Sequence, residues 1–275
     1  LVEFVLRSGD IDNRRGKSGQ KEAMQEGSRI HRKIQRRMGA SYQPEVPLKI
    51  ELQKEKYQLL IEGRADGIII EETGVAIDEI KGVYMDVQAL EAPIEVHLAQ
   101  AKCYAYIFAK QQELEEIRVQ MTYCNLDTEE IRRFQQGYSF EEIREWFEMV
   151  VGLYEKWANF QYEARIERNT SIEKLEFPYP YREGQKELAA GVYRTINREK
   201  NLFIQAPTGT GKTLSTIFPA VKAVGEGLAD KIFYLTAKTI TRTVAKEPFS
   251  LLAENGLCYK TVLLTAKEKI CPMEA

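Results

Sequence analysis

The sequence predicts an α/β protein made of two domains that are joined by a helical segment. Residues 46–82, VPLKIELQKEKYQLLIEGRADGIIIEETGVAIDEIKG, hold runs of apolar and β-branched residues that are separated by turn residues, which is typical of strands. After residue 200, strand-like and helical segments alternate around a glycine-rich turn, which favours a parallel sheet. Between these regions, LEFPYPYREGQ interrupts a helical pattern with two prolines and marks a domain boundary.

The first elements follow in order. Residues 17–38 predict an amphipathic helix with Ile30 and Ile34 on one side and a stop at Gly39. The β region at 46–82 comes next, then a helix at 95–113 and a strand at 117–126.

A charged helical pattern runs from Glu129 to about Lys174, with Trp146, Phe147, Tyr154 and Trp157 at helical spacing, and we assign these aromatic residues to packing. After the boundary we expect a helix, the strand NLFIQA, a turn, the helix TLSTIFPAVKAV and the strand KIFYLTA.

These patterns divide the chain into a first domain at 1–126, a helical connector at 127–175 and a second domain at 176–275. The chain begins with Leu1 rather than Met and stops at KEKICPMEA. We therefore expect both ends to be cuts through a longer protein, with the second domain truncated.

The composition is that of a soluble globular protein, with 44% hydrophobic and 29% charged residues among 275. Neither an apolar run of about 20 residues nor a signal-peptide pattern is present in this sequence, so we expect a cytoplasmic protein without a membrane span. The four cysteines, Cys103, Cys124, Cys258 and Cys271, are scattered, which suits reduced thiols better than disulfides.

The charge distribution singles out one basic stretch. Nine Lys or Arg residues lie between Arg14 and Arg37, against Glu22 and Glu26. The candidate phosphate contacts are the basic residues of its helix, Arg29, Arg32, Lys33, Arg36 and Arg37. From this stretch alone, a solvated helix face explains the pattern equally well.

The segment QAPTGTGKT, residues 205–213, lies between a predicted strand and a predicted helix, where a phosphate-binding loop belongs. Lys212 would reach the β- and γ-phosphates of ATP, and Thr213 would bind the nucleotide's Mg²⁺. The first position of the usual pattern is Ala206 instead of Gly. The candidate nucleotide contacts are the loop residues Ala206, Pro207, Thr208, Gly209, Thr210, Gly211, Lys212 and Thr213.

The loop AxTGTGKT resembles that of superfamily 2 helicases, which implies an incomplete RecA-like P-loop domain. The resemblance makes Gln185, in FPYPYREGQKELAAGVY, an adenine-reading residue, and FYLTAKTITRTVAKE a segment that contacts single-stranded DNA. LLTAKEKICP resembles the approach to the iron–sulfur insertion of XPD/DinG-type helicases. Cys271 would then be the first of four cluster ligands, and the cluster would form only in the full-length protein.

Only one Asp-Glu pair is present, Asp78-Glu79, and it lies upstream of the phosphate loop. The loop is therefore not followed by the Asp-Glu-Ala-His-type box that holds Mg²⁺. Because phosphoryl transfer also needs water activation and charge neutralisation, we expect this chain neither to hydrolyse ATP at a helicase-like rate nor to unwind duplex DNA.

The pleat of GRADGIIIEETGVAIDEIKG places Glu79 and Lys81 on one face of the second strand and Asp78 on the other. With a turn at Glu71–Gly74, Asp66 stands directly opposite Glu79. Like charges so placed are destabilising, which favours a cation between them. A hairpin with a solvated charged end is an equal alternative from these residues alone.

This arrangement resembles the PD-(D/E)XK nucleases, and further residues match their RecB-like branch. His31 in GSRIH takes the place of a metal-binding histidine, and Gln100 with Tyr104 in QAKCY matches QxxxY, whereas we assign His97 to packing. The resemblance implies a restriction-endonuclease-like mixed sheet flanked by helices.

The same resemblance implies a divalent ion, Mg²⁺ or Mn²⁺, held by His31, Asp66, Glu79 and the main-chain carbonyl of Ile80. Lys81 would position or help to deprotonate the attacking water, while Gln100 and Tyr104 would orient the DNA or the metal ligands. The branch can carry an iron–sulfur cluster, but the cysteines here do not fit one in this domain.

The sequence thus favours a metal-dependent DNA nuclease fused to the ATP-binding start of an iron–sulfur helicase in DNA repair or processing. Its partners would be ATP and DNA, single-stranded or with single-stranded ends. A non-cleaving DNA-binding clamp and an ATP-binding switch module are the alternatives.

Overall fold

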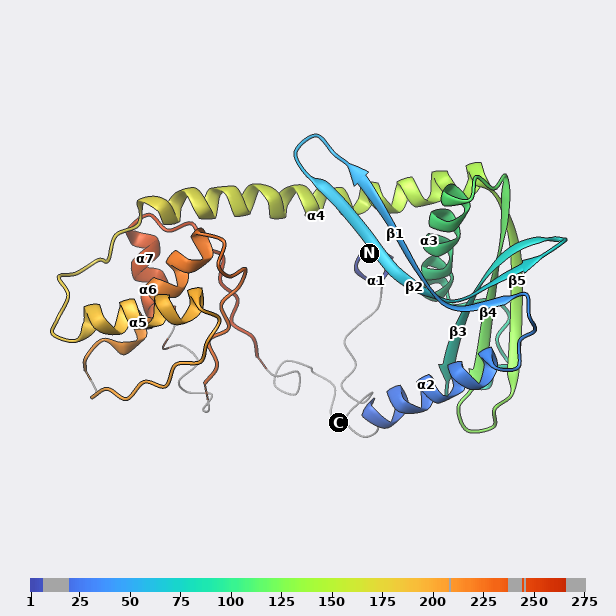
Figure 1. Ribbon diagram of the computed structural model, residues 1–275, viewed down its shortest axis with the longest axis horizontal. Coiled ribbons are helices and arrows are strands. Elements are labelled where there is room, and N and C mark those ends of the chain that lie inside the picture. Colours follow the sequence, from blue (N-terminus) through green and yellow to red (C-terminus); the bar gives the residue numbers. More distant parts are fainter. Residues whose placement is uncertain (7–19, 208, 237–243, 245, 266–275) are drawn as a thin grey trace. The chain divides into compact units, whose positions relative to one another are not determined.

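The computed structural model describes residues 1–6, 20–207, 209–236, 244 and 246–265, with side chains from Gln25 onward in the second of these ranges. The chain forms two compact units, which are described separately below: residues 1–158 and residues 159–266 (Figure 1). Among the described residues, none of the helices is long and apolar enough to cross a membrane.

A five-stranded sheet in the order β1-β2-β3-β4-β5 forms the frame of the first unit. The strands are β1 (Tyr42–Gln53), β2 (Gln58–Glu71), β3 (Gly74–Val83), β4 (Glu116–Asn125) and β5 (Ile131–Ser139). β3 and β4 pair in parallel, and the other neighbours pair antiparallel. The parallel pair requires a crossover, and α3 (Glu95–Gln111) provides it.

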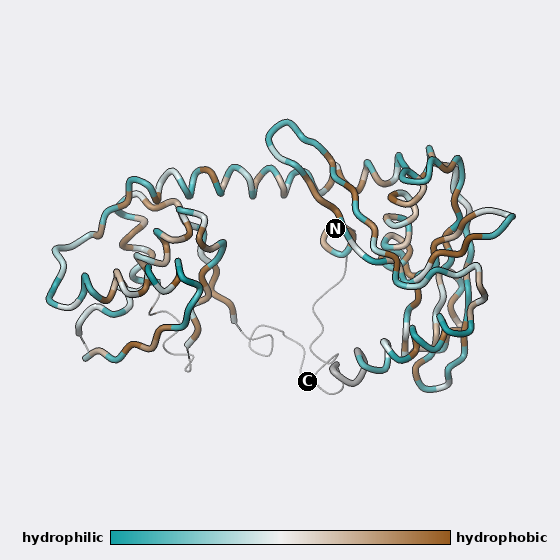
Figure 2. Tube along the Cα trace, viewed as in Figure 1, coloured by the Kyte–Doolittle hydropathy of each residue, from teal (hydrophilic) through white to brown (hydrophobic). Residues whose placement is uncertain are grey.

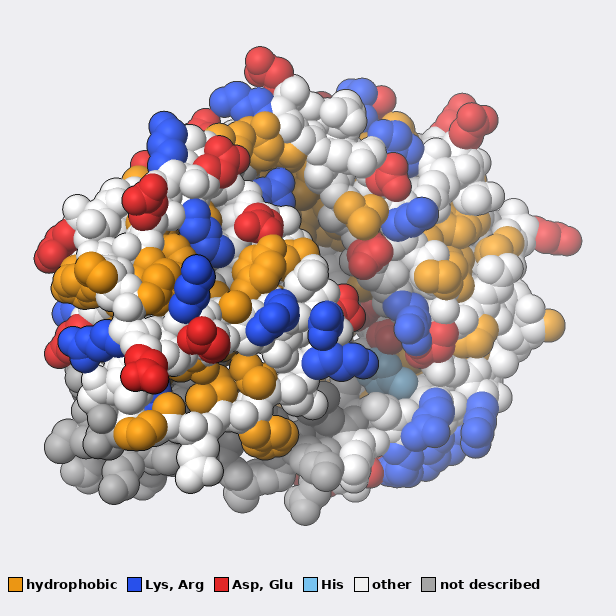
Figure 3. Space-filling model, turned by 60° about the vertical axis from the view of Figure 1, so that its left-hand side comes forward, with side chains coloured by type: hydrophobic (Ala, Val, Ile, Leu, Met, Phe, Trp, Pro, Cys, Tyr) orange, Lys and Arg blue, Asp and Glu red, His pale blue; other side chains and the backbone are white. Residues whose placement is uncertain are grey.

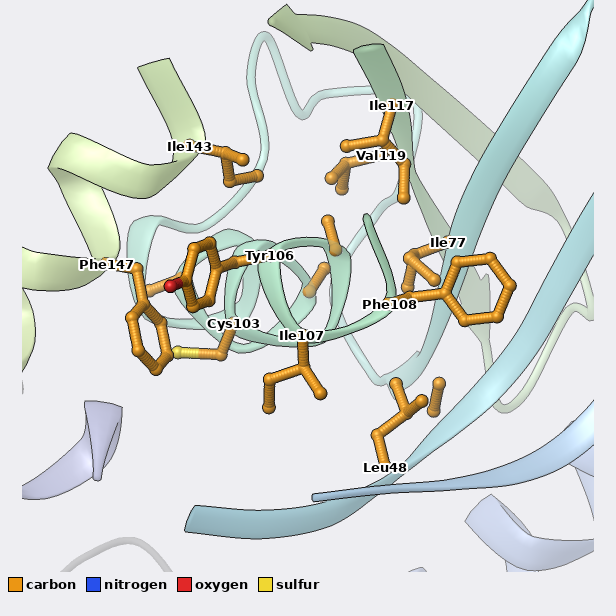
Figure 4. Packing of buried hydrophobic residues seen from close by; sticks show 14 of the residues in the cluster. Leu48, Ile77, Cys103, Tyr106, Ile107, Phe108, Ile117, Val119, Ile143 and Phe147 are labelled. Atoms are coloured by element: carbon orange, nitrogen blue, oxygen red, sulfur yellow. The ribbon is translucent and has the colours of Figure 1, made fainter. Parts of the chain in front are cut away.

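The main core lies between the sheet and α3 (Figure 4). Tyr106 of α3 stacks on Phe147 of α4 (Phe140–Lys174), with ring centroids 4.1 Å apart. Ile77 of β3 and Val119 of β4 are almost fully buried on the same side of the sheet. The predicted packing role of Phe147 is confirmed, since its side chain is 1% exposed.

A smaller core lies on the opposite face, under α2 (Gln20–Gln35). Ile30 and Ile34 of this helix pack with Ile80 of β3 and Cys124 of β4. The two apolar residues predicted on one side of the helix therefore dock it onto the sheet. The two cores also confirm the predicted alternation along β3, because Ile77 faces α3 and Ile80 faces α2.

Residues 131–139 correct the predicted helical pattern that begins at Glu129, because they form strand β5 along β4. Pairing with the exposed edge of β4 provides hydrogen bonds that override the weak local pattern of IRRFQQGYS. The helix predicted in this region is α4, which begins at Phe140. The sheet therefore extends into the segment predicted as a connector.

The second unit contains α5 (Gln185–Asn197), α6 (Lys212–Gly225) and α7 (Lys246–Glu254), and the last part of α4 belongs to it. Its core joins Ile172 of α4 to Ile217 and Val221 of α6 and to Leu252 of α7. Gly225 is required at a close approach, since a Cβ there would lie 2.4 Å from Ile172 Cγ2.

The strands predicted at NLFIQA and KIFYLTA are not formed in the described part of the second unit. Phe203, Phe233 and Leu235 are 96%, 74% and 88% exposed, and their segments include hydrophobic stretches of the tube in Figure 2. Parallel strands make their hydrogen bonds only with neighbouring strands. Without that pairing, these residues remain extended and unburied.

Three cysteines lie in the described residues and are free thiols: Cys103 and Cys124 are buried, and Cys258 is exposed. This agrees with the expectation of reduced thiols. Cys271 lies outside the described residues, as do residues 237–243 and 245 of the predicted DNA-contacting segment FYLTAKTITRTVAKE.

Candidate functional site

The polar site of the first unit is centred on Asp66, a residue of β2 that is paired with neither β1 nor β3, although β2 continues along β1 from Ala65. The predicted register of β2 and β3 is confirmed, because Ile70 pairs with Val75 and Ile68 with Ile77. The ladder ends at Gly67 with Asp78, however, so it does not include the predicted pair of Asp66 and Glu79. The Asp66 side chain replaces the strand pairing, because its Oδ2 accepts the Ile80 N–H at 2.8 Å.

This hydrogen bond also defines the position of Ile80. The N–H and C=O of one strand residue point to the same side of the strand, so the Ile80 carbonyl also faces the gap beside Asp66. The main-chain carbonyl that the sequence predicts as a metal ligand thus lies on the Asp66 side of β3.

His31 approaches Asp66 from α2, with Nδ1 3.1 Å from Asp66 Oδ1. Burial disfavours the charged imidazole, but the hydrogen bond and the charge of Asp66 outweigh it and raise the pKa of His31. The basic helix α2 therefore places His31 in contact with Asp66, as the resemblance implies.

Glu79 is the most deeply buried polar residue of this site, with 2% of its surface exposed. Burial and the neighbouring charge of Asp66 raise the pKa of Glu79 to about 7, although Lys81 opposes the shift. Its Oε1 accepts a hydrogen bond from Lys81 Nζ at 2.9 Å. Its Oε2 is buried and has no hydrogen-bond partner among the described residues.

Gln100 and Tyr104 of α3 complete the predicted set. Lys81 Nζ donates to Gln100 Oε1 at 2.9 Å, and Gln100 Nε2 donates to the Tyr104 hydroxyl at 3.3 Å. Tyr104 packs against Gly63 of β2, where a Cβ would lie 2.7 Å from the ring. Because an ammonium group has three donors, Lys81 keeps one for a water or a phosphate.

The donor types fit a hard divalent cation: two carboxylates, one main-chain carbonyl and one imidazole. The unpartnered Oε2 of Glu79 is an acceptor that such an ion would satisfy. Among the described residues, however, no group of three or more His, Cys, Asp or Glu side chains is arranged closely enough to hold a metal ion. His31 and Lys81 instead hydrogen-bond Asp66 and Glu79, so a metal would have to displace these contacts.

The basic face of α2 is partly neutralised by an acidic residue from another part of the chain. Glu129, between β4 and β5, pairs with Arg29 at 3.2 Å and with Lys33, and Arg29 also bonds Glu26. The hydrogen bonds from Lys33 and Arg29 lower the pKa of Glu129. Arg36 and Arg37 are exposed, and neither has an ion pair within the described residues.

Lys and Arg side chains gather beside a histidine at the lower right of the surface in Figure 3. Arg32, Arg36 and Arg37 thus provide the readily available charge of this face, whereas Arg29 and Lys33 are occupied. The pairing of Glu129 with Arg29 could not be predicted, because the two residues lie 100 positions apart in the sequence.

In the second unit, the predicted phosphate loop leads into α6, whose first residue is Lys212. Gly209 and Gly211 adopt φ values of 82° and 71°, which explains why glycine is needed at both positions. Lys212 Nζ donates to the carbonyls of Ala206 and Pro207 at 2.6 and 2.7 Å, so the loop binds its own lysine. Thr213 lies in the first turn of α6, and Thr208 lies outside the described residues.

Gln185 is 7% exposed, and its amide group braces the loop. Its Nε2 donates to the Thr210 carbonyl at 2.8 Å, and its Oε1 accepts the Arg182 N–H at 2.8 Å. The Arg182 guanidinium donates to the Gly209 carbonyl at 3.1 Å. In this arrangement Gln185 contacts the loop backbone, and Arg182 is a loop contact that the sequence prediction missed.

Comparison with known proteins shows what the segment around this loop is similar to. Residues 184–261 match the DEAD/DEAH box helicase family. This part of the chain is similar to superfamily 2 helicases. The chain is also 47% identical over 49 residues to the probable ATP-dependent helicase MJ0942 of Methanocaldococcus jannaschii, a match covering 18% of this chain and 8% of that protein.

The chain thus spans only 8% of the length of that relative. Among solved structures, the crystal structure of SSO0001 matches with 21% identity and a TM-score of 0.33, over 46% of this chain and 59% of that one. A TM-score this low supports no statement about the fold.

Proposed function

We propose that the first unit is a divalent-metal-dependent DNA nuclease domain of the PD-(D/E)XK type, with a restriction-endonuclease-like sheet. Because β5 belongs to that sheet, the proposed domain extends at least to Ser139 instead of ending at residue 126. α4 then takes the role of the helical connector, and the second unit is the start of a RecA-like helicase motor.

One observation carries the nuclease proposal. Glu79 is buried beside Asp66 with Oε2 unpartnered and with its pKa raised to about 7. A buried carboxylate in this state is costly unless a cation or proton neutralises it. Lys81 hydrogen-bonds both Glu79 and Gln100, and Gln100 hydrogen-bonds Tyr104. This network favours a catalytic site over a solvated hairpin end.

The ion would be held by His31, Asp66, Glu79 and the Ile80 carbonyl, either Mg²⁺ or Mn²⁺. When bound, it would lower the pKa of a coordinated water and neutralise charge on the scissile phosphate. Lys81 would exchange its hydrogen bond to Glu79 for one to the attacking water and would keep its hydrogen bond to Gln100. Arg32, Arg36 and Arg37 would contact the DNA backbone.

For the second unit we propose ATP binding through Lys212 and Thr213, with Mg²⁺ as the nucleotide's ion, in a protein that acts as a DNA helicase. The support is the family match and the helix that begins at Lys212. The XPD/DinG subtype, the iron–sulfur cluster at Cys271, a role in DNA repair and a preference for single-stranded DNA stay predictions.

The nuclease proposal is tested by incubating the chain with labelled single- and double-stranded DNA in Mn²⁺, Mg²⁺ or EDTA. Wild type should cleave only with a metal, whereas Asp66→Ala and Lys81→Ala should lose about 100-fold or more in rate. Glu72→Ala, in the exposed turn of the same hairpin, serves as the matched control and should cleave like wild type.

Cleavage that persists in both site variants would refute the assignment. DNA binding without cleavage on every substrate would favour the alternative of a non-cleaving clamp. A nucleotide-dependent change in partner binding, with neither cleavage nor DNA binding, would favour the switch module.

A further inference from the structure

We propose that Gln35 is a positioning residue that holds Asp66 outside the β-ladders so that its carboxylate can serve the metal site. The inference rests on the proposed nuclease function. The sequence motifs do not include Gln35, and its role follows from how the backbone of β2 is arranged at Asp66.

The ladder is interrupted on both sides of Asp66. Along β1, Pro44 pairs with Gly67 and Val46 with Ala65, but the intervening pair of Glu45 with Asp66 is absent. Glu45 adopts a φ of 56°, which non-glycine residues rarely take and which breaks the strand geometry there. Toward β3, the pairing stops at Gly67.

Gln35 occupies this interruption. It is the last residue of α2, and its Nε2 donates both to the Asp66 carbonyl and to Glu45 Oε1, each at 2.9 Å. The amide thereby replaces a ladder partner for a strand carbonyl and holds the displaced Glu45 at the same time. Main-chain carbonyls require partners, and the Asp66 carbonyl has two: Gln35 Nε2 at 2.9 Å and the Tyr42 hydroxyl at 3.4 Å. Gln35 is the shorter of these contacts and the one that also bonds Glu45.

The same helix contacts the Asp66 side chain. His31 is four residues before Gln35, so both lie on one face of α2. His31 approaches the Asp66 carboxylate, and Gln35 holds its main-chain carbonyl. With both groups fixed, Oδ2 of Asp66 is placed to accept the Ile80 N–H. Outer contacts of this kind orient metal ligands.

The test compares the full chain with Gln35→Met, which keeps the side-chain length and removes the amide. Gln43→Met makes the same change on an exposed residue of β1 and is the matched control. We expect Gln35→Met to weaken Mn²⁺ binding about tenfold in isothermal titration. Cleavage should fall at low Mn²⁺ and recover at high Mn²⁺, with kcat retained.

A purely structural role would give a different result. Loss of α2 docking would lower Tm in EDTA and DNA affinity in EDTA together, and added Mn²⁺ would not restore cleavage. That outcome, or wild-type Mn²⁺ affinity in Gln35→Met, would overturn the inference.

A metal-free measurement separates this inference from the proposed function. Hydrogen exchange of the Ile80 amide in EDTA should be faster in Gln35→Met than in wild type and in Gln43→Met. Unchanged exchange refutes the positioning role. Wild type that binds no Mn²⁺ refutes the proposed function, and the exchange result then still decides whether Gln35 positions Asp66.

Discussion

Glu129 is predicted to compete with DNA for the basic face of α2. Its carboxylate pairs with Arg29 and Lys33, two of the five basic residues predicted to contact phosphates. Glu129→Gln removes the charge and keeps the shape, so Lys33 becomes available, whereas Arg29 stays paired with Glu26. We expect tighter DNA binding at low salt together with a steeper dependence on salt.

The magnitude follows from counterion release. Each phosphate neutralised on single-stranded DNA adds about 0.7 to the slope of log affinity against log salt. The one released cation, Lys33, therefore steepens the slope by about 0.7. The affinity gain should shrink by roughly 2.6-fold between 50 and 200 mM salt.

Fluorescence anisotropy with a labelled oligonucleotide in EDTA measures this without cleavage. Glu72→Gln, in the exposed hairpin turn, changes the net charge of −2 by the same amount and is the matched control. If Glu129→Gln and Glu72→Gln have the same slope, Glu129 does not occupy a DNA-binding position and the reasoning is refuted.

Three further predictions concern pH, packing and nucleotide. The pKa of Glu79 is about 7 in the folded protein, against an ordinary 4.5. The folded state therefore binds this proton more tightly than the unfolded state, and the resulting stabilisation is complete below pH 4.5 and lost as the pH rises through 7. In EDTA, urea denaturation should therefore show wild type losing about 3 kcal/mol relative to Glu79→Gln between pH 4.5 and 8, and equal pH profiles would contradict this. Gly67→Ala would bring a Cβ to 2.0 Å from the Tyr42 ring and should lower the free energy of unfolding by about 1–3 kcal/mol. Gly152→Ala, where the added Cβ meets open space, should not lower it. Equal stabilities of the two variants would disprove the packing argument. Lys212→Met should abolish binding of a fluorescent ATP analogue, and retained binding would exclude the loop as the phosphate site.

The candidate site residues came from two sources: the pleat of the hairpin, which set Glu79 and Lys81 on one face, and the resemblance to the PD-(D/E)XK nucleases, which implied His31, Gln100 and Tyr104. His31, Glu79, Lys81, Gln100 and Tyr104 each lie on one regular element, where periodicity sets the direction of the side chain. Their contacts with one another then follow from the positions of those elements. The end of the β2–β3 ladder before Asp66 could not be predicted, because there the Asp66 side chain accepts the Ile80 N–H in place of a main-chain carbonyl.

The remaining errors have non-local causes. Strand β5 exists because β4 offers it an edge, which a helical local pattern does not reveal. The segments around Phe203 and Phe233 have the composition of strands, but composition cannot provide the neighbours that strands need. Gln35 could have been noticed from its spacing to His31, although its partner, the Asp66 carbonyl, is a main-chain group with no sequence signature.

The central claim is that Asp66 and Glu79 share a divalent ion. Isothermal titration of the full chain with Mn²⁺ tests it most directly, comparing wild type with Glu79→Gln and with the control Glu72→Gln. We predict that wild type and Glu72→Gln bind Mn²⁺ alike, and that Glu79→Gln binds it at least tenfold more weakly. Equal Mn²⁺ affinity in all three proteins would contradict the account.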